Sequence, residues 1–231
     1  MGWANDICEV FLQVTVIRPT WTPMKTILAM ISVVAAFAYS PSANAEQITL
    51  LALGDSLSAG YGLDPSAAFP VKLEAALRAK GHDVVVINAG VSGDTASQGA
   101  ARLDWSLGED VDGVIVELGA NDALRGLDPG QAEAALKMII DKLAEKNLPV
   151  LLAGMRAPPN LGPDYVKSFE GMYQRLGAAP HVTVYPFFLD GVAADPKLNQ
   201  ADGLHPTAAG VDVIVSRILP AVEELLVRAK K

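Results

Sequence analysis

The chain has 231 residues, of which 51% are hydrophobic and 19% charged, a composition that supplies a buried core for one ordinary domain. Its formal net charge of −8 argues against a nucleic acid or an anionic membrane as partner, because such partners favour basic surfaces. The single cysteine, Cys8, leaves the rest of the chain without a thiolate nucleophile, a disulfide or a thiolate metal ligand.

Residues 24–45 have the three parts of a secretory signal peptide. Met24-Lys25 gives a basic start, residues 27–39 form an apolar run, and residues 43–45 form an A-x-A end. The apolar run is shorter than the about 20 residues of a membrane-spanning helix, which favours export over a permanent anchor. We therefore predict cleavage after Ala45 and a periplasmic or secreted protein with no stable membrane anchor in its mature form.

Residues 1–23 are mixed in polarity, and we interpret them as a start-site artefact, with translation beginning at Met24.

The chain after the predicted signal peptide alternates between two patterns. In residues 46–231, apolar runs of strand length alternate with helical patterns. The expected strands are Ile48–Leu53, Val84–Asn88, Val114–Leu118, Val150–Met155 and Val182–Tyr185. The expected helices are Ala68–Lys80, Thr95–Leu107, Gly130–Lys146, Tyr165–Leu176 and Ala208–Arg228.

This alternation predicts a five-stranded parallel sheet with helices on both faces, a three-layer α/β/α domain. The strand candidates are nearly continuous apolar runs, as expected where both faces of a sheet are covered. Gly81 is interpreted as a helix stop, and Asp94 and Asp128-Pro129 as helix starts. Since ligands bind beyond the carboxyl ends of such strands, the polar residues that follow each strand are the candidates for a site.

Two of these candidates follow the first and second strands. Ser56 comes directly after Gly54, whose freedom to turn lets the Ser56 hydroxyl face a cleft and its N–H donate to an oxyanion. The alternative is that Ser56 only caps a helix. Gly93, after the second strand, presents its N–H to the same cleft, or else belongs to a plain glycine-rich turn.

The third and fifth strands add polar side chains. Asn121 is a candidate oxyanion donor or a residue of turn and capping chemistry, and Asp122 fits the capping interpretation better. Asp202 and His205 have a spacing that places both side chains on one turn, where the carboxylate can hold one imidazole nitrogen while the other faces a serine. The alternative is a surface turn with a coincidental histidine.

The positions of the three histidines separate these alternatives. His82 and His181 each precede a strand, on the wrong side of the sheet for the site, and only His205 lies on the carboxyl side. Ser56, Gly93, Asn121 and His205 come from four different strand ends, so their convergence on one edge favours a common site over four coincidences.

Four motifs resemble the conserved blocks of the GDSL/SGNH hydrolase family in order and spacing, and the resemblance covers nearly all of residues 46–231. They are Gly54-Asp55-Ser56-Leu57, Gly93-Asp94, Gly119-Ala120-Asn121-Asp122 and Asp202-Gly203-Leu204-His205-Pro206. Ala120 stands where a second glycine is commoner, which we do not expect to disturb Asn121. Longer stretches resemble the arylesterase-like branch of bacterial periplasmic multifunctional thioesterases, proteases and lysophospholipases. These stretches are Leu53–Tyr61, Ser92–Thr95, Val116–Gly126 and Pro186–Phe188.

The resemblance implies an SGNH hydrolase fold of the flavodoxin-like kind and an acyl-enzyme route. Ser56 would be the nucleophile, His205 the general base and then acid, and Asp202 the residue that orients His205. The Ser56 N–H, the Gly93 N–H and the Asn121 side chain would form the oxyanion hole. No metal or organic cofactor is implied, and the sequence has no His/Cys cluster at metal spacing. Residues 124–128 resemble the mobile loop that covers the acyl chain.

The implied substrate is a small acyl ester or thioester. Six residues expected near the cleft either line an apolar acyl groove or belong to the core: Tyr61, Leu124, Leu127, Met155, Pro158 and Phe188. A carbohydrate O-deacetylase of the same family is the alternative enzyme, and a non-catalytic binding module is disfavoured because no triad residue is missing. The chain has no Gly-x-Ser-x-Gly, so the nucleophile elbow of α/β-hydrolases is not indicated.

Overall fold

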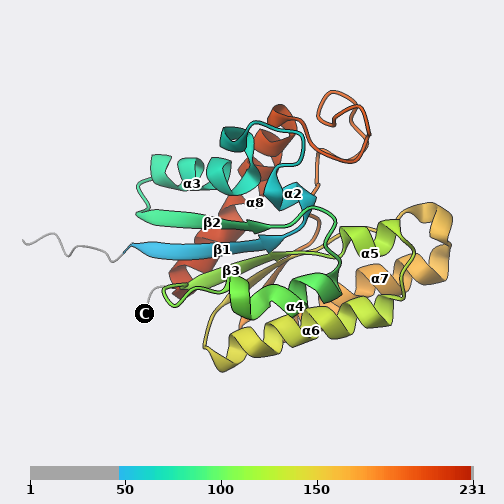
Figure 1. Cartoon of the computed structure of the whole chain (residues 1–231), viewed down its shortest axis with the longest axis horizontal. Coiled ribbons are helices and arrows are strands. Elements are labelled where there is room, and N and C mark those ends of the chain that lie inside the picture. Colours follow the sequence, from blue (N-terminus) through green and yellow to red (C-terminus); the bar gives the residue numbers. More distant parts are fainter. Residues whose placement is uncertain (1–46, 230–231) are drawn as a thin grey trace, which may run out of the picture. The chain divides into compact units, whose positions relative to one another are not determined.

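Five parallel strands form the centre of the domain. The computed structural model describes residues 47–229, and its sheet has the strand order β2-β1-β3-β4-β5 (Figure 1). The strands are β1 (Ile48–Gly54), β2 (Val84–Gly90), β3 (Gly113–Glu117), β4 (Val150–Ala153) and β5 (Val182–Tyr185). All neighbouring strands pair in parallel. The five predicted strands are confirmed, with ends that differ by at most two residues.

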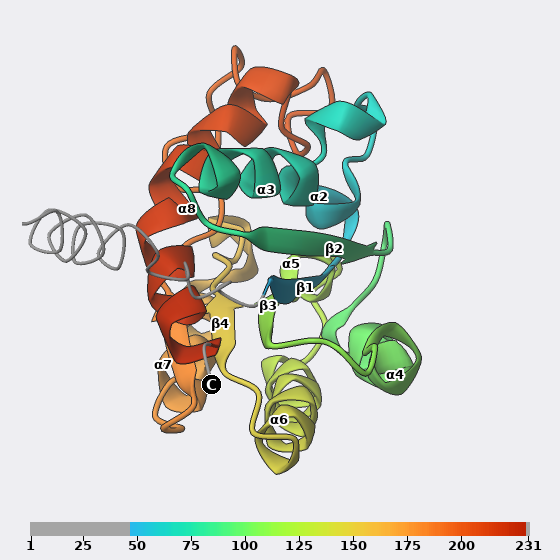
Figure 2. The same cartoon turned by 90° about the vertical axis from the view of Figure 1, so that its left-hand side faces the viewer.

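Helices cover both faces of this sheet, which confirms the three-layer α/β/α prediction. The long helices are α3 (Phe69–Ala79), α4 (Ala96–Ser106), α6 (Pro129–Glu145), α7 (Pro163–Leu176) and α8 (Ala208–Ala229). Helices α3 and α8 pack against each other on one face, whereas α4 and α6 cover the other face with α7 beside α6 (Figure 2). All five were predicted to within two residues of their observed ends.

The carboxyl ends of β1 and β3 are where the chain changes direction across the sheet. The connection from β1 leads to β2 on one side, whereas β3 lies on the other side of β1. A parallel sheet opens a crevice at such a switch point, and ligands bind there. Two short helices, which were not predicted from the sequence, begin at this crevice: α2 (Ser56–Ala59) after β1 and α5 (Ala120–Leu124) after β3. The structure also has two short 3₁₀ turns, η1 (Pro65–Ala67) and η2 (Pro159–Leu161).

The predicted helix ends were mostly correct, with one exception. Asp128 caps α6 by accepting a hydrogen bond from the Gly130 N–H at 2.8 Å, as predicted. The interpretation of Asp94 as the start of α4 was wrong, because Thr95 is the capping residue and forms a reciprocal capping box with Gln98. The Asp94 carboxylate instead binds the guanidinium of Arg102 at 2.6 Å.

The other helix-end residues behave as expected. Gly81 follows the last turn of α3 with a positive φ of 90°, which confirms its interpretation as a helix stop. The Asp122 carboxylate accepts from the Ala96 N–H at 2.8 Å, so it satisfies a free donor at the start of α4. This contact agrees with the capping interpretation of Asp122.

The core lies on both faces of the sheet, where the side chains of β1, β3 and β4 are buried. Within residues 47–229, no helix is both long enough and apolar enough to cross a bilayer. The predicted signal peptide, its cleavage after Ala45, the start-site artefact and Cys8 all lie outside the described residues.

Gly90 marks the closest approach of β2 to α2, and it gives a test of this packing. A Cβ at Gly90 would lie 2.3 Å from the Ala59 nitrogen and 2.8 Å from the Ser58 carbonyl carbon. Because a backbone cannot move aside cheaply, Gly90→Ala is expected to lower the free energy of unfolding by about 1–3 kcal/mol. Gly108→Ala is the matched control, since no atom lies within 4 Å of its Cβ position. Urea unfolding of both variants checks this, and equal stabilities would contradict the packing.

Candidate active site

Ser56, His205 and Asp202 form a hydrogen-bonded chain at the carboxyl edge of the sheet. Ser56 is the first residue of α2, and its Oγ lies 2.9 Å from Nε2 of His205, which is 149 positions away in the sequence. The other imidazole nitrogen, Nδ1, lies 2.6 Å from Asp202 Oδ2. With its proton on Nδ1, the imidazole can accept the hydroxyl proton at Nε2.

The Asp202 carboxylate is fixed by the turn that carries His205. Its Oδ1 accepts the backbone N–H of His205 at 3.0 Å and that of Leu204 at 2.9 Å. These two backbone hydrogen bonds, followed by the contact with the His205 side chain, lower the pKa of Asp202 to about 2. The carboxylate is therefore ionised at neutral pH, which favours an imidazole proton on the Nδ1 side.

Ser56 is not the capping residue of α2. That position belongs to Asp55, whose Oδ1 accepts from the Leu57 N–H at 2.9 Å. The Ser56 hydroxyl is consequently free of capping and faces the imidazole of His205. This arrangement removes the main structural alternative for Ser56.

A second set of contacts joins the segment after Ser56 to the segment around His205. The Tyr61 ring lies against the His205 imidazole, with ring centroids 4.5 Å apart. The side-chain amide of Gln200 donates to the Tyr61 carbonyl at 2.8 Å and to the Pro206 carbonyl at 2.9 Å. One side chain thus bridges two segments that are distant in the sequence, and it limits how far they can separate.

The three predicted oxyanion donors lie at adjoining strand ends, but they differ in their present partners. Asn121 Nδ2 donates to Asp55 Oδ2 at 3.0 Å and to the Asp94 carbonyl at 3.1 Å. The N–H groups of Ser56 and Gly93 have no acceptor among residues 47–229. Gly93 has a positive φ of 89°, and its carbonyl accepts from Arg125 at 2.8 Å.

Two buried carboxyl groups lie behind Ser56, and neither of them had a role predicted from the sequence. Asp55 and Glu117 are both fully buried. Burial is the main cause that raises the pKa of Asp55 to about 6, and burial followed by the charge of Asp55 raises the pKa of Glu117 well above its usual value. Glu117 is the last residue of an apolar strand, and only this position at the strand end could have indicated a functional role from the sequence.

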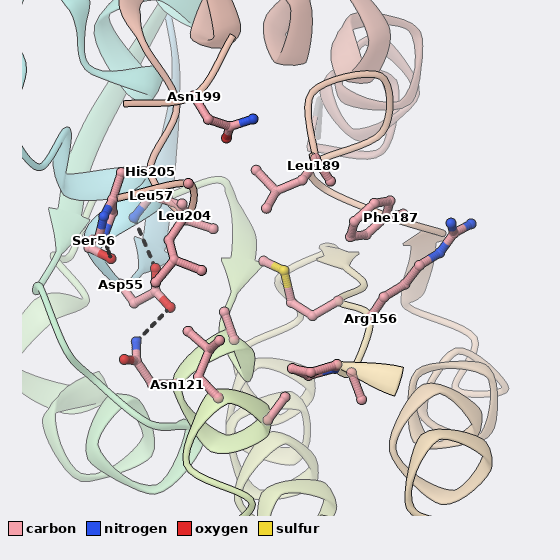
Figure 3. A pocket seen from close by; sticks show the side chains of 18 of the residues that line it. Asp55, Ser56, Leu57, Asn121, Arg156, Phe187, Leu189, Asn199, Leu204 and His205 are labelled. Atoms are coloured by element: carbon pink, nitrogen blue, oxygen red, sulfur yellow. Dashed lines mark hydrogen bonds between the residues drawn. The ribbon is translucent and has the colours of Figure 1, made fainter. Parts of the chain in front are cut away.

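A cavity of about 460 Å³ extends from Ser56 and His205 (Figure 3). Of the six residues predicted near the cleft, Leu124, Met155 and Pro158 line this cavity. Tyr61 and Leu127 do not line it and are partly exposed at the surface.

Phe188 belongs to the core, which is the second of the two alternatives left open for these six residues. Its side chain is fully buried in the core, where its ring packs edge-on against Phe69 with centroids 5.0 Å apart. The neighbouring Phe187 lines the cavity instead. Phe187 lies with Arg156 at the end away from Ser56 and His205, and the Arg156 guanidinium sits 4.6 Å from the centre of its ring (Figure 3).

Other lining residues were not predicted individually. They are mostly apolar and come from the ends of β1, β3 and β4 and from the segments after β5: Leu57, Ala120, Ala123, Ala157, Leu189, Ala193, Ala194 and Leu204. The remaining two histidines lie elsewhere, as predicted: His82 contacts Glu223 and His181 contacts the Ile140 carbonyl.

A family model matches the chain over residues 52–213, and that family is described as the GDSL-like lipase/acylhydrolase family. The chain belongs to this family. It is a GDSL/SGNH esterase, a hydrolase of ester bonds.

Relatives of this esterase cover most of its length. Esterase TesA of Pseudomonas aeruginosa is 40% identical over 179 residues, which are 77% of this chain and 89% of that protein. Thioesterase 1/protease 1/lysophospholipase L1 of Escherichia coli is 43% identical over 159 residues, which are 68% of this chain and 75% of that protein. The crystal structure of AlinE4, an SGNH-hydrolase family esterase, has 47% sequence identity to this chain and a TM-score of 0.66. The match covers 78% of this chain and 97% of the AlinE4 chain.

The contrast between Phe187 and Phe188 can be tested by truncating each ring. Phe188→Ala is expected to lower the free energy of unfolding by about 3–5 kcal/mol, because it empties a fully buried site. Phe187→Ala is expected to cost only about 1 kcal/mol, because that ring already faces a cavity. Urea unfolding of the two variants makes the comparison, and a larger loss for Phe187→Ala would reverse the assignment.

Proposed function

We propose that this esterase cleaves acyl esters and thioesters through an acyl-enzyme intermediate formed on Ser56. In this proposal His205 is the general base and then the general acid, and Asp202 orients its imidazole. The observation that carries the proposal is the continuous contact from Ser56 Oγ to His205 Nε2 and from Nδ1 to Asp202. This is the geometry that nucleophilic catalysis by serine requires.

The proposed reaction has two halves. Ser56 Oγ attacks the carbonyl carbon while its proton moves to His205 Nε2, and the tetrahedral intermediate collapses as His205 returns the proton to the leaving alcohol or thiol. A water molecule, deprotonated by His205, then attacks the acyl group on Ser56, and the second tetrahedral intermediate collapses as His205 returns that proton to Ser56 Oγ and the carboxylic acid leaves. The acyl carbon and both protons are accounted for, and His205 ends in its starting state.

The negative oxygen of each intermediate needs donors, and we assign these to Ser56, Gly93 and Asn121. The first two backbone N–H groups have no competing acceptor in the described part of the chain. Asn121 already donates to Asp55 and to the Asp94 carbonyl, so it would either share a hydrogen with the substrate or lengthen one contact as the charge develops. Backbone donors of this kind need no reorganisation during the reaction.

The cavity supports an acyl chain longer than acetyl. Its lining is largely aliphatic and includes Met155 and Pro158, and the cavity reaches Phe187 and Arg156 at the end away from Ser56 (Figure 3). Burial of each CH₂ in such a lining stabilises the complex by about 0.8 kcal/mol. We assign residues 124–128 to the cover of the acyl chain, because Leu124 lines the cavity while remaining half exposed. Tyr165 holds the Leu127 carbonyl of this segment at 2.7 Å.

A chain-length series tests the function, with p-nitrophenyl esters and acyl-CoAs as substrates for the parent enzyme and for Ser56→Ala. Turnover is expected to peak at medium or long acyl chains and to fall by about 10⁴–10⁶ in Ser56→Ala. A peak at acetyl, together with release of acetate from acetylated sugars, would favour the carbohydrate O-deacetylase instead. Near-normal turnover in Ser56→Ala would contradict the proposed nucleophile.

We also propose that the esterase is exported, on the strength of the signal-peptide pattern in residues 24–45. The full-length chain, expressed in a Gram-negative host, is expected to accumulate outside the cytoplasm with Glu46 as its first residue. Cell fractionation and mass spectrometry of the intact protein check this. A protein that keeps residues 24–45 and stays in the cytoplasmic or membrane fraction would contradict the prediction.

A further inference from the structure

We propose that Asp55 is a positioning residue of this esterase, whose carboxylate holds the Asn121 amide at the reaction centre while the buried Glu117 beneath it carries a proton. This inference rests on the proposed function, because it assigns to Asp55 an effect on catalysis that passes through Asn121. It concerns two buried acids that take no part in the proton transfers between Ser56 and His205.

The two oxygens of Asp55 serve two different elements. Oδ1 accepts from the Leu57 N–H at 2.9 Å and so fixes the start of α2, which carries Ser56. Oδ2 accepts from Asn121 Nδ2 at 3.0 Å and so fixes a side chain of α5 (Figure 3). A single carboxylate therefore sets the distance between the serine and the amide. A hydrogen bond to an ionised acceptor is stronger than one to a neutral acceptor, so the charge on Asp55 tightens this link.

Glu117 lies beneath Asp55 and is the better place for a proton. Its Oε2 accepts from the Ser58 hydroxyl at 2.7 Å and from the Asp55 N–H at 3.3 Å. Its Oε1 is fully buried and has no hydrogen-bond partner among residues 47–229. An ionised carboxylate with one oxygen in that position would be strongly disfavoured, whereas Asp55 receives a donor on each oxygen. The pair therefore holds one negative charge at neutral pH, and this charge is on Asp55.

Two other charged groups, Asp94 and His205, act on Asp55 from the surrounding segments. Asp94, before α4, repels the charge on Asp55, but it is itself paired with Arg102 at 2.6 Å. Arg102 also donates to the Gly54 carbonyl at 2.9 Å. His205 favours the ionised form of Asp55 when it is protonated. Burial outweighs these contributions and raises the pKa of Asp55 to about 6, so the carboxylate is lost as the pH falls through that value.

A double-mutant cycle tests whether Asp55 acts through Asn121. Asp55→Asn keeps a good helix cap for Leu57 but turns an amide NH₂ toward the NH₂ of Asn121, so it breaks the second contact. It is expected to lower kcat by about ten- to hundredfold with a smaller change in KM. In an Asn121→Ala background the further loss is expected to be less than about threefold. Losses that multiply in full would overturn the proposal, since a structural role of Asp55 predicts independence.

The pH profile adds a readout that loss of packing would not change. In the parent, kcat/KM is expected to fall as the pH drops through about 6, because Asp55 loses its charge there. In Asp55→Asn the acid limb is expected to become less steep, because the Asp55 carboxyl no longer titrates. Glu117→Gln keeps the shape of the neutral acid, so its acid limb is expected to stay where the parent's lies. An unaltered limb in Asp55→Asn, or a limb displaced by more than about one pH unit in Glu117→Gln, would overturn the proposal.

A measurement without ester turnover separates this inference from the proposed function. The side-chain amide of Asn121 is followed by ¹H–¹⁵N NMR in His205→Ala, which removes the nearby imidazole from the measurement. Its signal is expected to shift with a midpoint near pH 6, as Asp55 loses its charge. A signal that stays constant between about pH 5 and pH 8 would overturn the proposal, even if Asp55→Asn does not fold. A parent enzyme that hydrolyses no ester or thioester, while its His205→Ala variant shows this shift, would instead count against the proposed function.

Discussion

The parallel pairing of β1 with β3 is the constraint on which the rest of the site depends. This register places Gly54 opposite Glu117, so both strands end at the same level and release α2 and α5 into one crevice. Gly54 has to be glycine for this to happen, because a Cβ there would lie 2.2 Å from the Ser58 hydroxyl oxygen and 2.6 Å from Glu117 Oε2. The close approach of the two strand ends brings Asp55 within hydrogen-bonding distance of Asn121. It also buries the carboxyl groups of Asp55 and Glu117.

The regular elements could be predicted because each is long enough to show a pattern. Five apolar runs and five segments with helical periodicity predicted the three layers and most helix ends. The apolar runs are clear because strands covered on both faces have little room for polar residues. Helices α2 and α5 have four and five residues, too few to show helical periodicity, and they depend on the strands before them. The start of α4 was placed one residue early because Asp94 and Thr95 are both good caps. Only the structure shows that Arg102 holds Asp94 away from that role.

The candidate site also has a part that could be predicted from the sequence and a part that could not. Ser56, Asn121 and His205 could be placed together from the sequence because the carboxyl ends of parallel strands share an edge, and the same argument set His82 and His181 aside. The cavity was less predictable, since Phe187 and Phe188 lie beyond the end of β5, where no alternation of strand faces applies. Which of the two rings enters the core depends on Phe69, which lies far away in the sequence. The role of Glu117 was hidden for a similar reason, because its burial against Asp55 exists only once β1 and β3 are paired.

The site handles its negative charges in three different ways, and this matters because the proposed reaction creates another one beside them. Asp202 is held by two backbone N–H groups and by His205, Asp94 is paired with Arg102, and Asp55 has Glu117 as a protonated neighbour. A second ionised carboxylate behind Ser56 would oppose the oxyanion across a region of low dielectric, where like charges interact strongly. A proton on Glu117 removes that opposition, while the shape of the carboxyl group still supports Ser58 and the backbone of Asp55. The acidic pair and the proposed oxyanion donors are thus two sides of one electrostatic arrangement, built on the ends of two neighbouring strands.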